Sequence, residues 1–206
     1  MSRRLTVEAA RRALSEGRVV ALPTDTVYGL AARWDDAEAV STIFELKSRP
    51  RDVALPVLVA TSDQITALGV EWPERARRLA ERWWPGALTV AVPVVAELAQ
   101  RIGAEGSIGF RQPAAPITLD LLALSGPLAV TSANRHGHEP ARSAEEVLAT
   151  FAGTRLAGVL DGGRCDAVVS TVIELVGESW RLRRAGGVDV EQVAEILGPP
   201  LLDGDR

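Results

Sequence analysis

The stretch RVVALPTDTVYGL, residues 18–30, holds the pattern that decides the fold, because an apolar run passes directly into a polar segment. The apolar part, residues 18–23, is short and bounded by proline, which is consistent with a buried strand. Residues 36–47 follow as an expected helix, with a broad apolar stripe near a period of 3.6 residues. The same alternation continues along the chain, so we expect an α/β fold with a mixed sheet flanked by helices.

Further elements are expected on both sides of this stretch. The predicted helices cover residues 6–15, 61–69, 73–84, 117–124, 143–152 and 189–198. The predicted strands cover residues 55–60, 87–92, 107–112, 128–131, 156–160, 170–176 and 180–183. Thr61 with Gln64 and Ser143 with Glu146 form capping-box patterns, and Pro73 suits the first position of its helix.

The composition is that of a soluble globular protein, with 47% hydrophobic and 24% charged residues among 206. We expect a single domain over residues 1–200 and a short frayed tail over residues 201–206. One cysteine, Cys165, excludes an intramolecular disulfide and a multi-cysteine metal site. The N-terminal residues do not resemble a signal peptide and no apolar run is long enough to span a bilayer, so we expect a cytoplasmic protein without a membrane partner.

The charge pattern gives a narrower signal. The net charge is −4, which does not indicate a general affinity for nucleic acid, although a local arginine-rich face could exist. Lys47 is the only lysine, and all other basic residues are arginine. With Arg49 it could hold a phosphate chain from two sides. The alternative is that Lys47 only ends a helix, where a cation suits the helix dipole.

Four polar segments lie at expected strand or helix ends, where α/β proteins place binding groups. They are residues 23–30, residues 47–51, residues 131–134, and the pair formed by residues 170–172 with 181–187. Each has an ordinary structural explanation, as a capped turn, a solvated run of charge or a helix cap. None of the four indicates a function by itself.

Their joint order does indicate one. The motifs, in order, are TDTVYGL at residues 24–30, KSRP at 47–50, WPGALT at 84–89, TSAN at 131–134, STV at 170–172 and RAG at 184–186. This order resembles the YrdC/TsaC family, and the resemblance runs from about residue 19 to residue 187. The pairs Lys47 with Arg49 and Ser132 with Asn134 resemble the synthase branch rather than the YciO-like branch, and the length resembles the short form.

The resemblance implies a single YrdC-like domain with a twisted sheet and a concave ligand-binding face. It implies a nucleotidyltransferase, L-threonylcarbamoyladenylate synthase, which joins L-threonine, bicarbonate or CO2, and ATP into threonylcarbamoyl-AMP and pyrophosphate for t6A modification of tRNA. Mg²⁺ is expected with ATP, held mainly by phosphates and water. The expected downstream partners are t6A transfer proteins of the TsaD, TsaB and TsaE type. This chemistry needs no protein nucleophile and depends on orientation and electrostatics.

The nucleotide-binding residues are assigned by matching positions in the motifs. The resemblance implies that Lys47 and Arg49 hold the phosphates as the catalytic pair, and that Ser132, Asn134 and Arg184 bind the nucleotide. Lys47 is therefore expected in the site rather than in the core.

The threonine-binding residues follow in the same way. Thr26 and Ser170 are implied as threonine ligands, Arg111 as the partner of the threonine carboxylate, and Tyr28 as part of the pocket wall. No residue is assigned to a metal.

The chain departs from the family pattern in two places. Family members commonly have a polar residue and a proline where this chain has Val53 and Ala54, which changes one expected nucleotide contact. The second departure is the loop with His136 and His138. Two histidines without a third ligand do not predict a metal site, so we expect both to be solvent-exposed.

The remaining conspicuous residues have structural explanations. Residues 161–163, with the sequence Asp-Gly-Gly, are expected to form a turn, and Cys165 is expected to be inert because no base lies near it. Trp83 and Trp84 are expected to pack against the core rather than to stack on bases.

Two other functions remain open at this point. The first is a non-catalytic module that binds double-stranded RNA or tRNA, which would bind with strong salt dependence and would not turn over ATP. The second is a carbamoyl transferase related to part of the HypF proteins, which would be expected to carry an acylphosphatase-like or zinc-finger neighbour.

Overall fold

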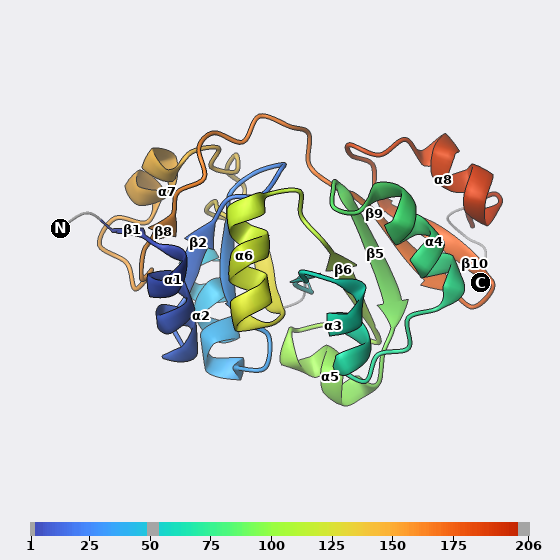
Figure 1. Cartoon of the computed structure of the whole chain (residues 1–206), viewed down its shortest axis with the longest axis horizontal. Helices are drawn as coiled ribbons and strands as arrows, with labels where there is room; N and C mark the ends of the chain where they lie inside the picture. The colour runs from blue at the N-terminus through green and yellow to red at the C-terminus, as the bar shows by residue number, and fades with distance from the viewer. Residues whose placement is uncertain (1–2, 49–53, 202–206) are drawn as a thin grey trace.

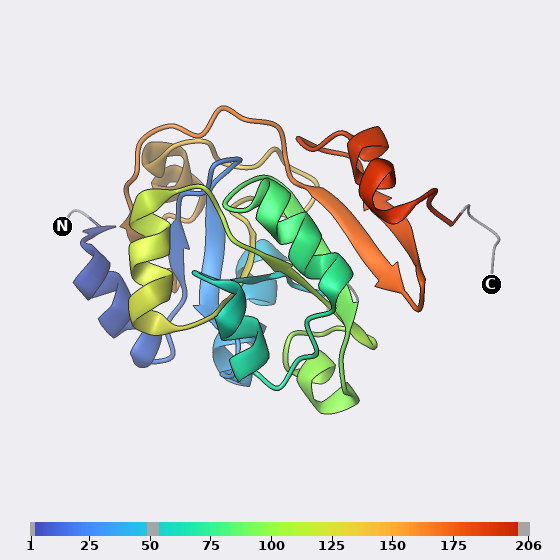
Figure 2. The same cartoon turned by 45° about the vertical axis from the view of Figure 1, so that its right-hand side comes forward.

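A computed structural model describes residues 3–48 and 54–201 of the chain. In this part of the chain, ten strands form one mixed sheet in the order β1-β8-β2-β3-β7-β4-β6-β5-β9-β10. Figure 1 shows the strands fanned across the molecule with helices on both faces, and Figure 2 shows the twist of the sheet from a second direction. The predicted α/β class is confirmed.

The strands are short, and the chain visits the sheet out of sequence order. Their bounds are β1 Arg4–Leu5, β2 Val20–Leu22, β3 Gly29–Arg33, β4 Val57–Leu58, β5 Leu88–Pro93, β6 Ser107–Arg111, β7 Leu128–Ser132, β8 Val159–Leu160, β9 Thr171–Val176 and β10 Ser179–Arg184. Parallel pairs such as β5 with β9 stand beside antiparallel pairs such as β3 with β7, which makes the sheet mixed.

Eight helices accompany these strands in the described ranges. Their bounds are α1 Val7–Ser15, α2 Ala37–Lys47, α3 Ser62–Ala67, α4 Glu74–Trp83, α5 Ala96–Arg101, α6 Pro116–Ser125, α7 Ala144–Thr150 and α8 Val190–Leu197. Helix α2 begins where Asp36 accepts from the backbone N–H of Ala39 at 2.9 Å, and it ends at Ser48, whose φ of 53° breaks the helical path.

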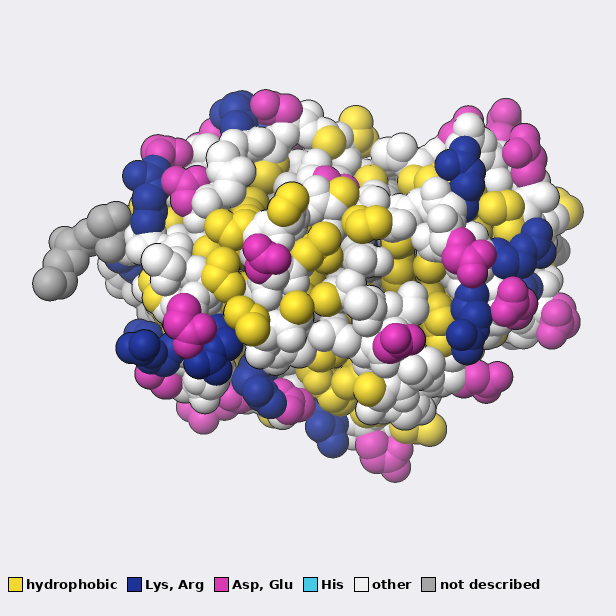
Figure 3. Space-filling view, in the orientation of Figure 1, with side chains coloured by type: hydrophobic (Ala, Val, Ile, Leu, Met, Phe, Trp, Pro, Cys, Tyr) yellow, Lys and Arg dark blue, Asp and Glu magenta, His cyan; other side chains and the backbone are white. Residues whose placement is uncertain are grey.

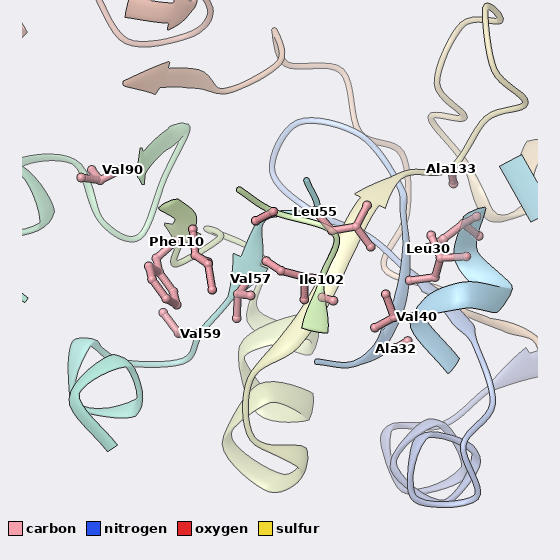
Figure 4. Packing of buried hydrophobic residues seen from close by; sticks show 14 of the residues in the cluster. Leu30, Ala32, Val40, Leu55, Val57, Val59, Val90, Ile102, Phe110 and Ala133 are labelled. Atoms are coloured by element: carbon pink, nitrogen blue, oxygen red, sulfur yellow. The ribbon is translucent and has the colours of Figure 1, made fainter. Parts of the chain in front are cut away.

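Two apolar clusters hold the helices on the sheet. The smaller cluster packs α1 and α6 against β2, β3 and β7, through residues such as Leu14, Leu121 and Leu128. The larger cluster packs α2 and α4 on the sheet, and Figure 4 shows part of it, with Leu30 and Ala32 beside Val40. Burying two large apolar faces of one sheet supplies the main driving force for this arrangement.

Most predicted elements are found, and several strands, such as β2, β4 and β8, are shorter than expected. Three elements were not predicted: β1, β3 and α5. Strand β3 has the sequence Gly-Leu-Ala-Ala-Arg, which carries little β-branched or aromatic character. It forms because β2 and β7 pair with it on both sides, so tertiary context decides its structure.

Three predictions about helix starts are wrong in detail. Thr61 makes no side-chain bond to α3, and Gln64 instead accepts from the backbone N–H of Ala60 at 2.7 Å. Pro73 is the cap residue of α4 and not its first residue. Ser143 does cap α7 by accepting from Glu146 N, but the Glu146 carboxylate accepts from the backbone N–H of Arg142 instead of Ser143.

The surface shown in Figure 3 carries apolar side chains over its middle, and its basic side chains lie around the rim with acidic ones among them. None of the helices in the described ranges has the length and apolar character needed to cross a membrane. The backbone N–H of Leu201 donates to the carbonyl of Trp180 at 2.8 Å, so the expected tail is anchored at its first residue.

Candidate functional site

A cavity of about 400 Å³ opens over the middle strands of the sheet. Its wall combines the turn between β2 and β3 with residues of β5, β6, β7, β9 and β10. The polar residues that line it are Thr24, Thr26, Tyr28, Thr89, Ser107, Arg111, Thr131, Ser132, Ser170 and Arg184. Five of the six segments that the motif order singled out therefore meet at one place, although they are far apart in sequence; the segment of residues 47–50 contributes no described residue to the lining.

The turn after β2 forms one end of the cavity. Thr24 Oγ1 donates to the carbonyl of Val27 at 2.6 Å and accepts from the backbone N–H groups of Thr26 and Val27, at 3.1 Å each. The Thr24 and Thr26 hydroxyls lie 2.9 Å apart. Both side chains are buried. The hydrogen bonds of Thr24 hold this turn, which presents Thr26 to the cavity.

Arg111 lies beside this turn at the end of β6. Its Nη2 donates to Asp25 Oδ1 at 2.6 Å, its Nη1 donates to Thr26 Oγ1 at 3.2 Å, and its Nε donates to the carbonyl of Gly86 at 2.9 Å. Burial lowers the pKa of Arg111, the Asp25 carboxylate opposes that shift, and the nearby positive charge of Arg184 adds to it. The guanidinium is therefore fixed on three sides at the cavity wall.

Arg184 faces the cavity from β10. Its Nε donates to the carbonyl of Ser170 at 3.0 Å and its Nη2 donates to Ser170 Oγ at 2.9 Å. Ser170 Oγ also lies 3.1 Å from the buried Thr89 hydroxyl. No carboxylate among the described residues forms an ion pair with Arg184. The Arg184 charge is thus available to an anion that enters the cavity.

Lys47 is buried, with 2% of its surface exposed. Its ammonium group donates to the carbonyl of Ser132 at 2.6 Å, to the carbonyl of Asn134 at 3.1 Å and to Asn134 Oδ1 at 2.9 Å. The expectation that Lys47 lies outside the core is therefore wrong, because the side chain holds the turn after β7 and does not line the cavity. Arg49 lies outside the described residues.

Asn134 belongs to the same turn. Its Oδ1 accepts from Ser132 Oγ at 2.6 Å, and its Nδ2 donates to the carbonyls of Arg135 and His138 at 3.0 and 2.6 Å. Every polar atom of the Asn134 amide is therefore used within the turn. Ser132 lines the cavity, and Asn134 lies directly behind it.

Tyr28 is fully buried, and its ring belongs to the larger apolar cluster. Its hydroxyl donates to the carbonyl of Gly163 at 2.7 Å and accepts from the backbone N–H of Gly162 at 3.3 Å. Burial raises the pKa of Tyr28 to about 12. Tyr28 lines the cavity as expected, but its hydroxyl is directed at the turn of residues 161–163.

Six of the nine predicted site residues line the cavity: Thr26, Tyr28, Arg111, Ser132, Ser170 and Arg184. The first departure from the family pattern is the pair Val53 and Ala54. Val53 lies outside the described residues, and Ala54 lines the cavity, where it offers only a methyl group and backbone. The binding roles of all nine residues remain predictions.

Several residues of the site were not predicted. Asp25 and Thr24 stand in the motif that was singled out, but nothing in the sequence shows that Asp25 faces an arginine 86 residues away. Thr89 ends the predicted WPGALT motif and could have been found there. Ser107 lines the cavity, with its hydroxyl donating to Glu174 at 2.7 Å, and had no signal of its own.

The described residues do not form a metal-binding cluster. No group of three or more His, Cys, Asp or Glu side chains among them is placed to hold an ion, and no carboxylate belongs to the cavity lining. His136 and His138 are exposed in a loop, as expected. Cys165 is buried and burial raises the pKa of its thiol, which fits the expected inert role.

The tryptophans next to the site pack as predicted. The Trp84 ring stacks on that of Trp72 with centroids 5.5 Å apart, and the Trp84 Nε1 donates to the carbonyl of Leu88 at 2.7 Å. Trp83 packs against the larger apolar cluster. Gly86 follows in a turn where an added Cβ would lie 2.5 Å from the Trp83 carbonyl oxygen, and its own carbonyl accepts from Arg111.

Comparisons with known proteins agree with the motif order. The model of the Sua5/YciO/YrdC family, which carries the description "Telomere recombination", matches residues 12–186. A Mycobacterium tuberculosis protein is 38% identical over 194 residues, and the alignment covers 93% of this chain and 89% of that protein. The threonylcarbamoyl-AMP synthase of Bacillus subtilis is 39% identical over 201 residues, which are 96% of this chain and 58% of that synthase.

The fold is also that of a solved structure. The crystal structure of Pyrococcus abyssi Sua5 complexed with L-threonine superimposes with a TM-score of 0.87 at 39% identity. The match covers 93% of this chain and 57% of that one, so this chain spans little more than half the length of the Pyrococcus and Bacillus proteins. Sequence, fold and cavity agree, and the chain belongs to the Sua5/YciO/YrdC family.

Proposed function

We propose that this chain is an enzyme, L-threonylcarbamoyladenylate synthase, which joins L-threonine, CO2 or bicarbonate, and ATP into threonylcarbamoyl-AMP and pyrophosphate. One observation carries the proposal: two arginines meet at one cavity, one clamped beside hydroxyl groups and the other without a carboxylate partner in the described ranges. Relatives that bear the synthase name, and a relative complexed with L-threonine, support the same assignment.

The threonine end of the cavity is assigned to Arg111 and Thr26. The Arg111 guanidinium has five N–H donors, of which three are used by Asp25, Thr26 and Gly86. The remaining two can donate to a carboxylate of the substrate, and burial strengthens such a charge-assisted contact. Tyr28 forms part of the wall beside this end.

The nucleotide end is assigned to Arg184 with Ser132. Arg184 is braced by Ser170, and the guanidinium is a planar donor well matched to phosphate oxygens. Ser132 lines the same cavity and is held by hydrogen bonds with Lys47 and Asn134. We assign Lys47 and Asn134 to this end through their hold on Ser132, and Arg49 to the phosphates by its motif. Ser170 lines the cavity beside Arg184, and we assign it to threonine by its motif.

The chemistry requires orientation more than acid–base catalysis. The threonine amine takes up CO2 to give a carbamate, whose oxygen forms a bond to the α-phosphorus of ATP. The bond from that phosphorus to the bridging oxygen breaks, and pyrophosphate leaves. Arg184 would stabilise negative charge on the phosphate oxygens, and Arg111 would hold the threonine in reach of it. The residues of the cavity offer no cage for Mg²⁺, so we assign the ion to the ATP complex and derive no step through it.

The proposal is tested by pyrophosphate release from ATP by the purified protein, with and without L-threonine and bicarbonate. Release that needs both additions is the expected result. Absence of release under every addition would contradict the proposal and favour the RNA-binding function, which a salt-dependent gel shift with double-stranded RNA would then report. The proposal also includes use of the product for t6A modification of tRNA, contact with transfer proteins of the TsaD, TsaB and TsaE type, and a cytoplasmic location.

A further inference from the structure

Thr89 lies in the cavity wall on β5, between two neighbouring strands. Strand β5 pairs with β6 on one side and with β9 on the other. A Cβ added at Gly109 of β6 would lie 3.0 Å from Thr89 Cγ2, so the Thr89 methyl group packs over a position without a side chain. The Thr89 hydroxyl lies 3.1 Å from Ser170 Oγ, directly before β9. These two contacts fix the Thr89 side chain, which is 3% exposed.

The Ser170 hydroxyl has a second polar neighbour, the guanidinium of Arg184. Arg184 Nη2 donates to Ser170 Oγ at 2.9 Å, and Arg184 Nε donates to the Ser170 carbonyl at 3.0 Å. An arginine N–H only donates, so the first contact uses one of the two lone pairs of Ser170 Oγ. The orientation of Arg184 therefore depends on the place of the Ser170 hydroxyl.

The Thr89 and Ser170 hydroxyls hold two protons, and only one of them is used in the bond between them. Neither hydroxyl donates to another acceptor in the part of the chain that the structure describes. One proton is therefore left for a ligand. An oxygen that accepts from Arg184 lies next to Ser170 and can take the Ser170 proton, and Thr89 then donates to the second lone pair of Ser170 Oγ.

We propose that Thr89 is a positioning residue, whose hydroxyl holds Ser170 against Arg184 and leaves the Ser170 proton for an anionic oxygen in the cavity. The inference rests on the proposed function. In that reaction two groups bring such an oxygen, the carbamate of threonine and the phosphate of ATP, and both can only accept. Thr89 acts on either group through Ser170.

A double-mutant cycle tests this relation. Thr89→Val keeps the shape and the methyl packing of the side chain but removes the hydroxyl, whereas Thr89→Ser keeps the hydroxyl. Ser170→Ala removes the group through which Thr89 acts. The wild type, the three single variants and the Thr89→Val, Ser170→Ala double variant are compared by kcat/KM for pyrophosphate release. Titration calorimetry without threonine gives their dissociation constants for ATP.

Thr89→Val should lower kcat/KM by about 10-fold, because Ser170 Oγ loses a buried partner and faces a methyl group. In the Ser170→Ala background the same substitution should change kcat/KM by less than about 2-fold, since no hydroxyl is left for Thr89 to hold. Thr89→Ser should stay within about 2-fold of the wild type, because the hydroxyl is kept. Thr154→Val is the matched control without an effect, because it removes a hydroxyl bond to Phe151 outside the cavity lining.

The dissociation constant for ATP identifies the source of the oxygen. If Thr89→Val weakens ATP as much as it lowers kcat/KM, the oxygen belongs to the phosphate. If kcat/KM falls while ATP binding is unchanged, the oxygen belongs to the carbamate. Both results support the inference, provided that the loss disappears in the Ser170→Ala background.

Equal losses from Thr89→Val with and without the Ser170 hydroxyl would overturn the inference, as would a folded Thr89→Val protein with wild-type kinetics. If Thr89→Val does not fold, Thr89→Ala adds no bulk and takes its place in the cycle. A wild type that releases no pyrophosphate fails the proposed function. The inference then stands only if the cycle shows the same coupling in the dissociation constants for ATP.

Discussion

Asp25 and Arg111 form an ion pair of 2.6 Å at the wall of the cavity, and only 18% and 7% of their side-chain surfaces are exposed. The same Asp25 oxygen accepts from the backbone N–H of Ala114 at 2.9 Å, which ties the turn after β2 to the chain that follows β6. The Asp25 carboxylate therefore orients the buried Arg111 guanidinium. It also holds the turn after β2 close to the segment that follows β6.

The first prediction concerns this carboxylate. Asp25→Ala should raise the KM for L-threonine in the pyrophosphate-release assay by about 10-fold or more, because a buried guanidinium loses its partner and its orientation. The KM for ATP should change much less, since Arg184 is braced by Ser170 instead. Thermal unfolding of the same variant should show a lower Tm.

Two further variants control this experiment. Asp25→Asn keeps an oxygen that can accept from Arg111 and Ala114, so its KM for threonine should lie between those of the wild type and Asp25→Ala. Asp35→Ala removes the partner of Arg33 at the exposed surface and should leave both KM values unchanged. An equal rise of both KM values in Asp25→Ala would indicate general damage rather than a threonine-specific role.

The second prediction concerns Tyr28, which is the only tyrosine of the chain. Burial raises its pKa to about 12 from an ordinary value near 10, so the absorbance change at about 295 nm should have its midpoint near pH 12 in the folded protein. Because the folded pKa is raised, the contribution of Tyr28 to stability is fully present below pH 10 and is lost as the pH rises from 10 to about 12.

The measurement is a spectrophotometric titration of native protein against protein unfolded in denaturant, where the ordinary pKa should return. Tyr28→Phe should remove the signal and also the fall in stability between these pH values. A native midpoint near pH 10 would show that the hydroxyl is not buried against the turn of residues 161–163, and that its bond to Gly163 is absent in solution.

The fold was largely predictable where local signals agree with packing. Helix α2 has a cap at Asp36 and an apolar stripe, and it was found with its end at Lys47. Strand β3 has neither signal, because its small residues are required by neighbours rather than by propensity. At Gly29 an added Cβ would lie 2.5 Å from Cγ1 of Val130, so β3 and β7 can pair closely only with glycine there.

The site was predictable as a set of segments and less so as a set of contacts. The family resemblance implied roles for Thr26, Arg111 and Arg184 at one site, and all three line the cavity. Sequence patterns do not show which polar groups neutralise one another across 80 residues, so the Asp25 partner of Arg111 was missed. The burial of Lys47 was missed for the same reason, since its acceptors come from the turn after β7.

That burial leads to the third prediction. Lys47→Met keeps the length of the side chain and removes the ammonium group, so the carbonyls of Ser132 and Asn134 lose a buried donor. The free energy of unfolding should fall by about 3 kcal/mol, together with a loss of pyrophosphate release. Chemical denaturation gives the stability, and Arg155→Met, which removes a surface ion pair with Glu45, is the control without an effect. Wild-type stability with lost activity would instead place Lys47 at the phosphates and not in a structural clamp.

The fourth prediction concerns the close approach of the chain after β10 to the start of β9. A Cβ added at Gly186 would lie 2.2 Å from the carbonyl oxygen of Val169 and 2.4 Å from the carbonyl carbon of Ser170, both backbone atoms that cannot move independently. Gly186→Ala should therefore push Arg184 away from Ser170 and raise the KM for ATP by about 10-fold or more, because the guanidinium loses its two contacts.

Gly187→Ala is a matched control in the next position, where the nearest atom is the Ala87 side chain at 3.1 Å, and its KM for ATP should stay closer to that of the wild type. If both variants bind ATP alike, the position of Arg184 does not depend on this contact, and its hold on Ser170 alone must be enough to keep it at the nucleotide end of the cavity.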